Sequence, residues 1–113
     1  MNIDTIEALR KYIQANKLAE LSASGNSMFP TINKNDKIFV EDIDKPISIG
    51  DIILFYDGKD NEISLVAHRV IKAIDDKFFI TKGDNNTSAD YPVRKKNILG
   101  KVIRIEPIKG DNK

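Results

Sequence analysis

Residues 63–74 read Ile-Ser-Leu-Val-Ala-His-Arg-Val-Ile-Lys-Ala-Ile, a run rich in β-branched residues. Side chains alternate between the two faces of a strand, so Val66, His68 and Val70 would share one face. Arg69 would point to the opposite face, where we expect a structural role and a pairing with an acidic residue. The run therefore predicts a strand that carries the only histidine of the chain between two valines.

Five further β-rich runs surround this one, and turn-forming sequences rich in Asn, Asp, Gly and Pro separate them. They cover residues 18–23, 37–42, 50–56, 77–81 and 97–108. Six short strands of this kind, preceded by one helix, predict a mostly β fold. We expect a small, partly open antiparallel β-barrel.

The first residues of the chain predict the helix. Apolar side chains recur there at helical spacing, at Ile3, Ile6, Leu9 and Ile13. Asp4 is the expected N-cap, with Glu7 three residues later, and the helix should end near Asn16. We expect the apolar stripe to pack on the domain, the alternatives being a helix that lies on a membrane interface or docks on a partner.

The length and composition indicate the number of domains and exclude several kinds of site. The 113 residues suggest one domain, with a helix over 1–17, a β domain over 18–108 and a disordered tail over 109–113. Eighteen basic and 17 acidic residues give a net charge of +1, which does not favour nucleic acid as a partner. The absence of cysteine excludes disulfides and thiolate metal sites, and a single histidine argues against zinc. We expect no metal and no cofactor.

Residues 24–32, Ser-Gly-Asn-Ser-Met-Phe-Pro-Thr-Ile, place Ser27 on a turn that Gly25 opens and Pro30 closes. A serine nucleophile needs a turn that exposes its hydroxyl, a neighbouring base, and donors for the oxyanion. His68 could be that base. The order along the chain would then allow a triad of serine, histidine and aspartate.

The aspartate would come from the loop that follows the β-rich run at residues 77–81. This loop offers two carboxylates, Asp84 and Asp90, and either could orient an imidazole. Each candidate also has a simpler interpretation. A serine in such a turn is usually a turn former or a helix cap, and a half-buried histidine can be satisfied by a backbone carbonyl. The sequence around Asp84 could be a plain turn in which Gly83 supplies a positive φ.

Four blocks of the sequence, in order and at compatible separations, resemble the signal peptidase I family and its wider clan of LexA-like serine peptidases. The blocks are Ser27-Met28-Phe29-Pro30-Thr31, Gly50-Asp51-Ile52-Ile53, His68-Arg69-Val70-Ile71 and Gly83-Asp84-Asn85-Asn86. Each alone is weak evidence, but four in order make a chance match improbable. The resemblance implies a barrel of the LexA/signal peptidase type. It also selects the histidine subtype, because most bacterial signal peptidases carry a lysine base where this chain has His68.

The resemblance assigns the catalytic roles. It implies that Ser27 is the nucleophile, that His68 is the base and that Asp90 is the carboxylate that pairs with it. We expect Asp84 to shape the loop, although which of the two aspartates orients the histidine stays open. Ser88 aligns with a polar residue that supports the base in lysine-type enzymes.

The surroundings of the serine are assigned in the same way. Lysine-type enzymes have an oxyanion-binding serine at the position of Gly25, so backbone amides or the side chains of Asn26 or Ser24 would have to serve instead. The side chains expected to wall the substrate pocket are Met28, Phe29 and Ile32.

The implied function is a serine endopeptidase that cleaves leader or signal segments of precursor peptides, with small residues at the first and third positions before the cut. The substrate would bind as an extended strand along the barrel edge. Two alternatives remain. A self-cleaving LexA-like domain is less favoured, because the chain has no Ala-Gly or Cys-Gly pair. A catalytically idle barrel that binds an extended peptide is the other.

The family resemblance also implies a membrane anchor before the nucleophile, and this chain offers no candidate. Its longest apolar run, residues 52–56, is far below the roughly 20 residues that span a bilayer. Six charged residues within the first 24 argue against an anchor or a signal peptide. We therefore expect a cytoplasmic protein, a protein peripheral to the membrane or docked on a membrane partner through the helix, or an anchored one if the sequence is part of a longer protein. The oligomeric state stays open.

Overall fold

The computed structural model describes residues 1–59 and 61–108, which contain one α-helix, one 3₁₀-helix and seven strands. In chain order they are α1 (Ile3–Asn16), β1 (Leu18–Ser22), β2 (Lys37–Glu41), β3 (Ile52–Asp57), β4 (Ser64–Ile74), β5 (Phe78–Lys82), β6 (Val93–Arg94), η1 (Lys95–Asn97) and β7 (Ile98–Glu106). The tail predicted at 109–113 lies outside the described residues.

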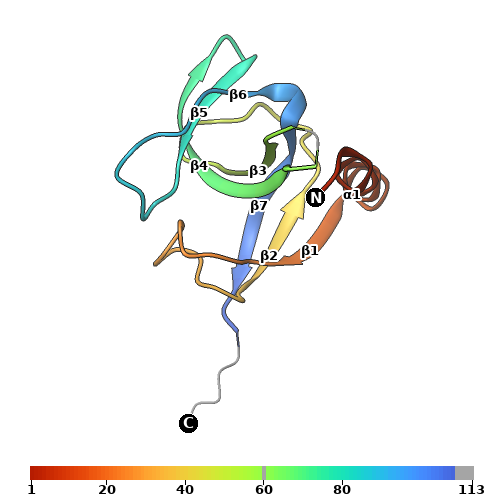
Figure 1. Cartoon of the computed structure of the whole chain (residues 1–113), viewed down its shortest axis with the longest axis horizontal. Helices are drawn as coiled ribbons and strands as arrows, with labels where there is room; N and C mark the ends of the chain where they lie inside the picture. Colours follow the sequence, from red (N-terminus) through yellow and green to blue (C-terminus); the bar gives the residue numbers. More distant parts are fainter. Residues whose placement is uncertain (60, 109–113) are drawn as a thin grey trace.

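The strands form one sheet in the order β1-β2-β7-β3-β4-β5-β6, and every neighbouring pair is antiparallel. The sheet curls strongly along β3 and β4, while β1 and β6 remain its two edges (Figure 1). The predicted fold class, a mostly β, partly open antiparallel barrel with one N-terminal helix, is confirmed.

Strand β3 is buried on both faces and divides the core into two clusters. Its residues Ile52 and Leu54 belong to a cluster that includes the helix, whereas Ile53 and Phe55 belong to a second cluster with residues of β4 and β5. Because successive side chains point to opposite faces, a single central strand can contribute to both clusters.

Strand β4 shows the alternation that the sequence predicted. Val66 and Val70 pack in the second cluster, and Leu65 and Ala67 pack against the first. His68 lies on the face of the valines and is 7% exposed. Strand β5 pairs with β4 only from Arg69 onward, so among the described strands residues 64–68 are paired on one side only, with β3.

The N-cap of the helix is Asn2. The prediction that Asp4 caps the helix was therefore wrong. Asn2 has an extended backbone (φ −102, ψ 170), and its Oδ1 accepts a hydrogen bond from the Thr5 N–H at 2.9 Å. Asp4 therefore lies inside the first turn, where its negative charge interacts favourably with the helix dipole. The predicted end at Asn16 is confirmed, and Lys17 closes the helix with φ 66.

Two differences from the prediction lie in the second half of the chain. Strand β6 was not predicted, because two residues are too short to show a periodic pattern; Val93 pairs with Phe79 of β5. The last predicted strand, 97–108, was too long at both ends: Asn97 is the last residue of η1, and β7 runs from Ile98 to Glu106.

Candidate active site

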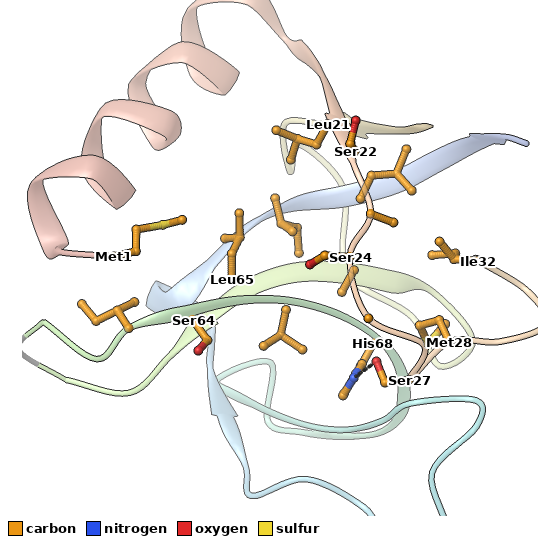
Figure 2. Close-up of a pocket in the computed structure, with 17 residues that line it drawn as sticks. Met1, Leu21, Ser22, Ser24, Ser27, Met28, Ile32, Ser64, Leu65 and His68 are labelled. Carbon is orange, nitrogen blue, oxygen red and sulfur yellow. Dashed lines mark hydrogen bonds between the residues drawn. The ribbon is translucent and has the colours of Figure 1, made fainter. Parts of the chain in front are cut away.

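The turn between β1 and β2 presents Ser27 to the interior of the curled sheet (Figure 2). Gly25 has φ +75 and nothing within 4 Å of the position of an added Cβ, so its backbone conformation, and not lack of space, requires glycine. The turn is closed by hydrogen bonds from Phe29 N–H to Asn26 O (3.1 Å) and from Ile32 N–H to Met28 O (2.9 Å).

Three of the predicted residues meet in one hydrogen-bonded series. His68 Nε2 is 2.9 Å from Ser27 Oγ, and His68 Nδ1 is 2.6 Å from Asp90 Oδ2. If Nδ1 carries the proton and donates a hydrogen bond to the carboxylate, Nε2 is free to accept a hydrogen bond from the serine hydroxyl. The imidazole is 10% exposed and packs edge-on against Phe55, with ring centroids 6.2 Å apart.

Asp90 has a second partner that the sequence analysis missed. Thr81 Oγ1 donates to Asp90 Oδ2 at 2.7 Å, and the Asp90 N–H donates to Thr81 O at 2.8 Å. The available signal was the alternation of β5, which places a hydroxyl on the same buried face as Phe79.

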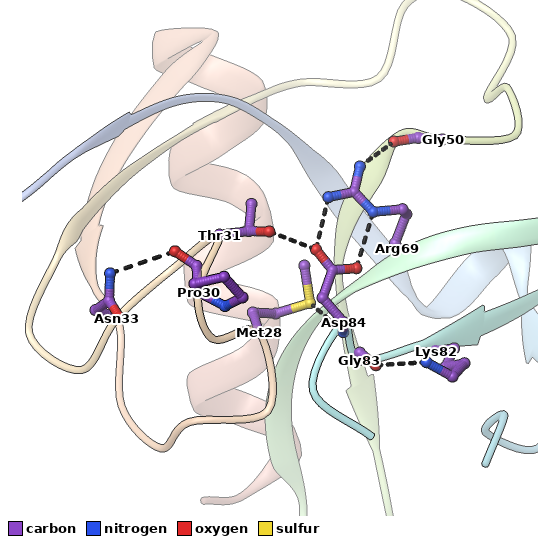
Figure 3. A network of polar contacts seen from close by, with 9 residues as sticks. All are labelled: Met28, Pro30, Thr31, Asn33, Gly50, Arg69, Lys82, Gly83 and Asp84. Atoms are coloured by element: carbon purple, nitrogen blue, oxygen red, sulfur yellow. Dashed lines mark hydrogen bonds and ion pairs between the residues drawn. The ribbon is translucent and has the colours of Figure 1, made fainter. Parts of the chain in front are cut away.

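Asp84 forms a different network, with Arg69 and Thr31 (Figure 3). Its carboxylate accepts from Arg69 Nε at 2.9 Å, from Arg69 Nη2 at 2.7 Å and from Thr31 Oγ1 at 2.6 Å. The hydrogen bonds from Arg69, helped by Thr31, lower the pKa of Asp84 to about 2, and the same pairing raises the pKa of Arg69. Arg69 thus pairs with an acidic residue, as predicted, and joins β4 to the loop.

The loop that begins at Gly83 is fastened to the serine turn by hydrogen bonds. Asn85 donates from its N–H to Ser27 O (2.8 Å) and from Nδ2 to Asn26 O (3.1 Å). Gly83 is not among the glycines with positive φ, which corrects the expectation stated for it. An added Cβ at Gly83 would lie 2.6 Å from Ser27 O, so glycine is needed here for close approach.

A cavity of about 640 Å³ opens beside Ser27 and His68. One wall is formed by residues 21–25 and the other by residues 64–68, the part of β4 that is paired on one side only. Of the predicted pocket residues, Met28 and Ile32 line the cavity and are buried, whereas Phe29 is 52% exposed and is not part of the lining.

The predicted supporting residues differ in their positions. Gly25 and Ser24 line the cavity, whereas Asn26 does not. The Ser27 N–H makes no hydrogen bond within the part of the chain that the structure describes. Ser88 is exposed, and its hydroxyl makes no hydrogen bond to another described residue.

Across residues 1–59 and 61–108, no group of three or more His, Asp or Glu side chains is arranged to hold a metal ion. None of the helices in the same ranges is long and apolar enough to cross a bilayer.

Comparison with known proteins gives a family match over most of the chain. The profile of the family described as Peptidase S24-like matches residues 2–103, which include Ser27, His68 and Asp90.

Two curated relatives carry the description "Signal peptidase complex catalytic subunit SEC11". The protein of Ogataea parapolymorpha is 29% identical in an alignment 106 residues long that covers 74% of this chain and 59% of that protein. The protein of Clavispora lusitaniae is 36% identical in an alignment 78 residues long that covers 65% of this chain and 46% of that protein. The chain thus spans about half the length of the curated relatives it matches.

Proposed function

The chain belongs to the peptidase S24-like family, and from that premise we propose that it is a serine endopeptidase that cleaves leader or signal segments of precursor peptides. The observation that supports this best is the hydrogen-bonded series from Ser27 through His68 to Asp90 at the side of an open cavity. The similarity to catalytic subunits of signal peptidase complexes supports the class of substrate.

The reaction begins when the Ser27 hydroxyl attacks a peptide carbonyl. His68 accepts the hydroxyl proton at Nε2, and Asp90 stabilises the imidazolium through Nδ1. The tetrahedral intermediate collapses when His68 gives the proton to the leaving amine, which releases the C-terminal product. Water then attacks the acyl-enzyme with His68 again as the base, and Ser27 is regenerated.

The oxyanion of the intermediate needs donors close to Ser27 Oγ. The Ser27 N–H is unused by the described residues and lies on the turn itself. Gly25 has no side chain to contribute where lysine-type enzymes have a serine, so a second donor would come from another amide of the turn or from Ser24, which lines the cavity. Each such donor contributes roughly 3 kcal/mol to transition-state stabilisation in comparable enzymes.

The cavity walls fit an extended peptide. Residues 64–68 of β4 are paired with β3 on one side only, and β1 is an edge strand of the sheet. A substrate strand placed between them would hydrogen-bond to exposed backbone, which is a common mode of peptide recognition. We propose that small residues at the first and third positions before the cut point toward the cavity floor near Met28 and Ile32.

We further propose that the chain works at the membrane surface together with partner subunits. The support is the description of its relatives as subunits of a complex. Fractionation of the native protein and its co-purifying chains tests this; recovery only as a single chain in the soluble fraction would contradict it.

The catalytic proposal is tested by active-site labelling with a fluorophosphonate probe and by cleavage of a peptide with alanine at the first and third positions before the cut. We expect wild type to be labelled and to cleave, and Ser27→Ala to do neither. Ser48→Ala is the matched control, because Ser48 is exposed and lies outside the cavity lining. Equal labelling of wild type and Ser27→Ala would rule out Ser27 as the nucleophile. A folded wild type that never reacts would favour the idle peptide-binding barrel.

A further inference from the structure

Thr81 is a fully buried polar residue whose neighbours Val70 and Phe79 belong to the second core cluster. It lies on β5 directly opposite Val70 of β4, and the burial pattern of β5 places it on the same face as Phe79. Its exposed fraction is 0%, so its hydroxyl has no access to water and depends on a protein partner.

That partner is the carboxylate that meets the histidine. Thr81 Oγ1 lies 2.7 Å from Asp90 Oδ2, and the same oxygen lies 2.6 Å from His68 Nδ1. One carboxylate oxygen therefore accepts two hydrogen bonds, one from β5 and one from β4. The Asp90 N–H also donates to Thr81 O at 2.8 Å, so a single residue of β5 binds both the main chain and the side chain of Asp90.

Asp90 needs such an anchor because it does not lie on a strand. It lies in the loop between β5 and β6, where no strand ladder fixes its backbone. The terminal torsion of an aspartate side chain is broad, so the carboxylate orientation is set by its hydrogen-bond donors. Threonine is a stiff donor because its β-branched side chain has few rotamers on a strand.

We propose that Thr81 is a positioning residue for the Ser27–His68–Asp90 site. Its hydroxyl holds Asp90 Oδ2 against His68 Nδ1, and this contact keeps the imidazole turned with Nε2 toward Ser27. The consequence for turnover rests on the proposed peptidase function. The consequence for the state of the imidazole does not.

The kinetic test compares two substitutions that separate the hydroxyl from the methyl group. Thr81→Val keeps the shape and removes the donor, whereas Thr81→Ser keeps the donor. We expect kcat to fall about 10- to 100-fold in Thr81→Val, by analogy with the range seen when a group that orients a metal-bound histidine is removed. KM should change little, because Thr81 does not line the cavity. Thr81→Ser should restore most of the lost kcat.

The second test needs no turnover. His68 is the only histidine, so imidazole NMR signals report on one ring. We expect a strongly downfield Nδ1–H signal in wild type and in Thr81→Ser, and its loss or a large upfield shift in Thr81→Val. This readout distinguishes the two proposals: an inactive wild type that keeps the signal contradicts the peptidase function but leaves the role of Thr81 testable.

The matched control is Thr31→Val. Thr31 also donates its hydroxyl to a carboxylate of this loop, at 2.6 Å, but the carboxylate belongs to Asp84. We expect Thr31→Val to leave the His68 signal unchanged. If Thr81→Val fails to fold, Thr81→Ala and Thr81→Ser form a second pair that differs only in the hydroxyl. Wild-type kcat and an unchanged His68 signal in either hydroxyl-free variant would overturn the inference, as would equal impairment of Thr81→Ser and the hydroxyl-free variants.

Discussion

Asp84 and Asp90 belong to the same loop between β5 and β6, and each is held by one basic side chain and one threonine hydroxyl. Asp84 has Arg69 and Thr31 as its partners. Asp90 has His68 and Thr81. The two basic residues are neighbours on β4 and point to opposite faces of the strand, so β4 directs one carboxylate to each side.

The difference between the two networks lies in the basic partner. A guanidinium keeps its proton at all accessible pH values, so the Arg69–Asp84 pair can fasten the loop but cannot transfer a proton. An imidazole exchanges its proton near neutral pH, so the His68–Asp90 pair can serve chemistry. Two similar hydrogen-bond patterns thus separate into a structural network and a candidate catalytic one.

The largest expected effect comes from converting each aspartate to asparagine. We expect Asp90→Asn to keep the fold and to lower kcat by about 10⁴-fold, the loss known for the corresponding change in a well-studied Ser-His-Asp peptidase, because an amide cannot balance the imidazolium. Asp84→Asn should lower stability while its folded fraction retains kcat within about tenfold. Steady-state kinetics and thermal unfolding of both variants measure this. A folded but inactive Asp84→Asn beside an active Asp90→Asn would reverse the two assignments.

The next largest effect concerns Gly83, which begins the loop that carries Asp84 and Asp90. Gly83→Ala would bring its Cβ to 2.6 Å from Ser27 O, a backbone atom that cannot swing away. We expect a stability loss of about 1–3 kcal/mol from overpacking and a loss of kcat of about 10²-fold from displacement of the serine turn.

Gly25→Ala is the matched control for this variant. It meets no neighbour and pays only for its positive φ, about 1–2 kcal/mol. Chemical denaturation and kinetics compare the two alanine variants. A Gly83→Ala protein with wild-type stability and kcat would show that the contact between loop and turn is easily relaxed.

Much of the architecture could be predicted because it depends on local patterns. Alternation along residues 63–74 placed His68 with the valines and Arg69 on the other face, and helical spacing located the helix to its last residue. Turn-forming sequences separated the strands. The family could be recognised from four short blocks in order, and its profile matches residues 2–103. The catalytic roles drawn from those blocks stay predictions.

What could not be predicted depends on contacts between distant residues. Thr81 looks like an ordinary strand residue until the loop folds back and brings Asp90 to its hydroxyl. The role of Gly83 depends on its distance from Ser27 O, which no local pattern contains. The choice of Asn2 over Asp4 as the helix cap depends on which residue turns extended just before Ile3, a difference of two positions between similar side chains.

A smaller effect distinguishes the two networks by pH. The pKa of Asp84 falls from its ordinary 3.8 to about 2 in the folded protein. A lowered folded pKa contributes stability that is present above about pH 4 and is lost as the pH falls toward 2, and the shift corresponds to about 2 kcal/mol. We expect the stability difference between wild type and Asp84→Asn to shrink over this range. Urea unfolding at pH 5 and pH 2 measures it; a constant difference would show that the ion pair does not supply the stability.

The smallest expected effect is that of Thr31→Val, which removes the hydroxyl that donates a hydrogen bond to Asp84. Asp84 keeps both hydrogen bonds from Arg69, so we expect a stability loss of only about 1 kcal/mol at pH 7. The Thr31 hydroxyl helps to lower the pKa of Asp84 in the folded protein, so the acid-induced loss of stability should be smaller in the variant and should be complete at a higher pH. Thermal unfolding between pH 2 and pH 7 measures both effects.

Thr31 belongs to the Arg69–Asp84 network and not to the His68–Asp90 network. In Thr31→Val, kcat should therefore stay within a few-fold of wild type, in contrast to Thr81→Val. A fall in kcat as large as that of Thr81→Val would mean that the two networks are coupled through the loop and that the separation between Asp84 and Asp90 does not hold.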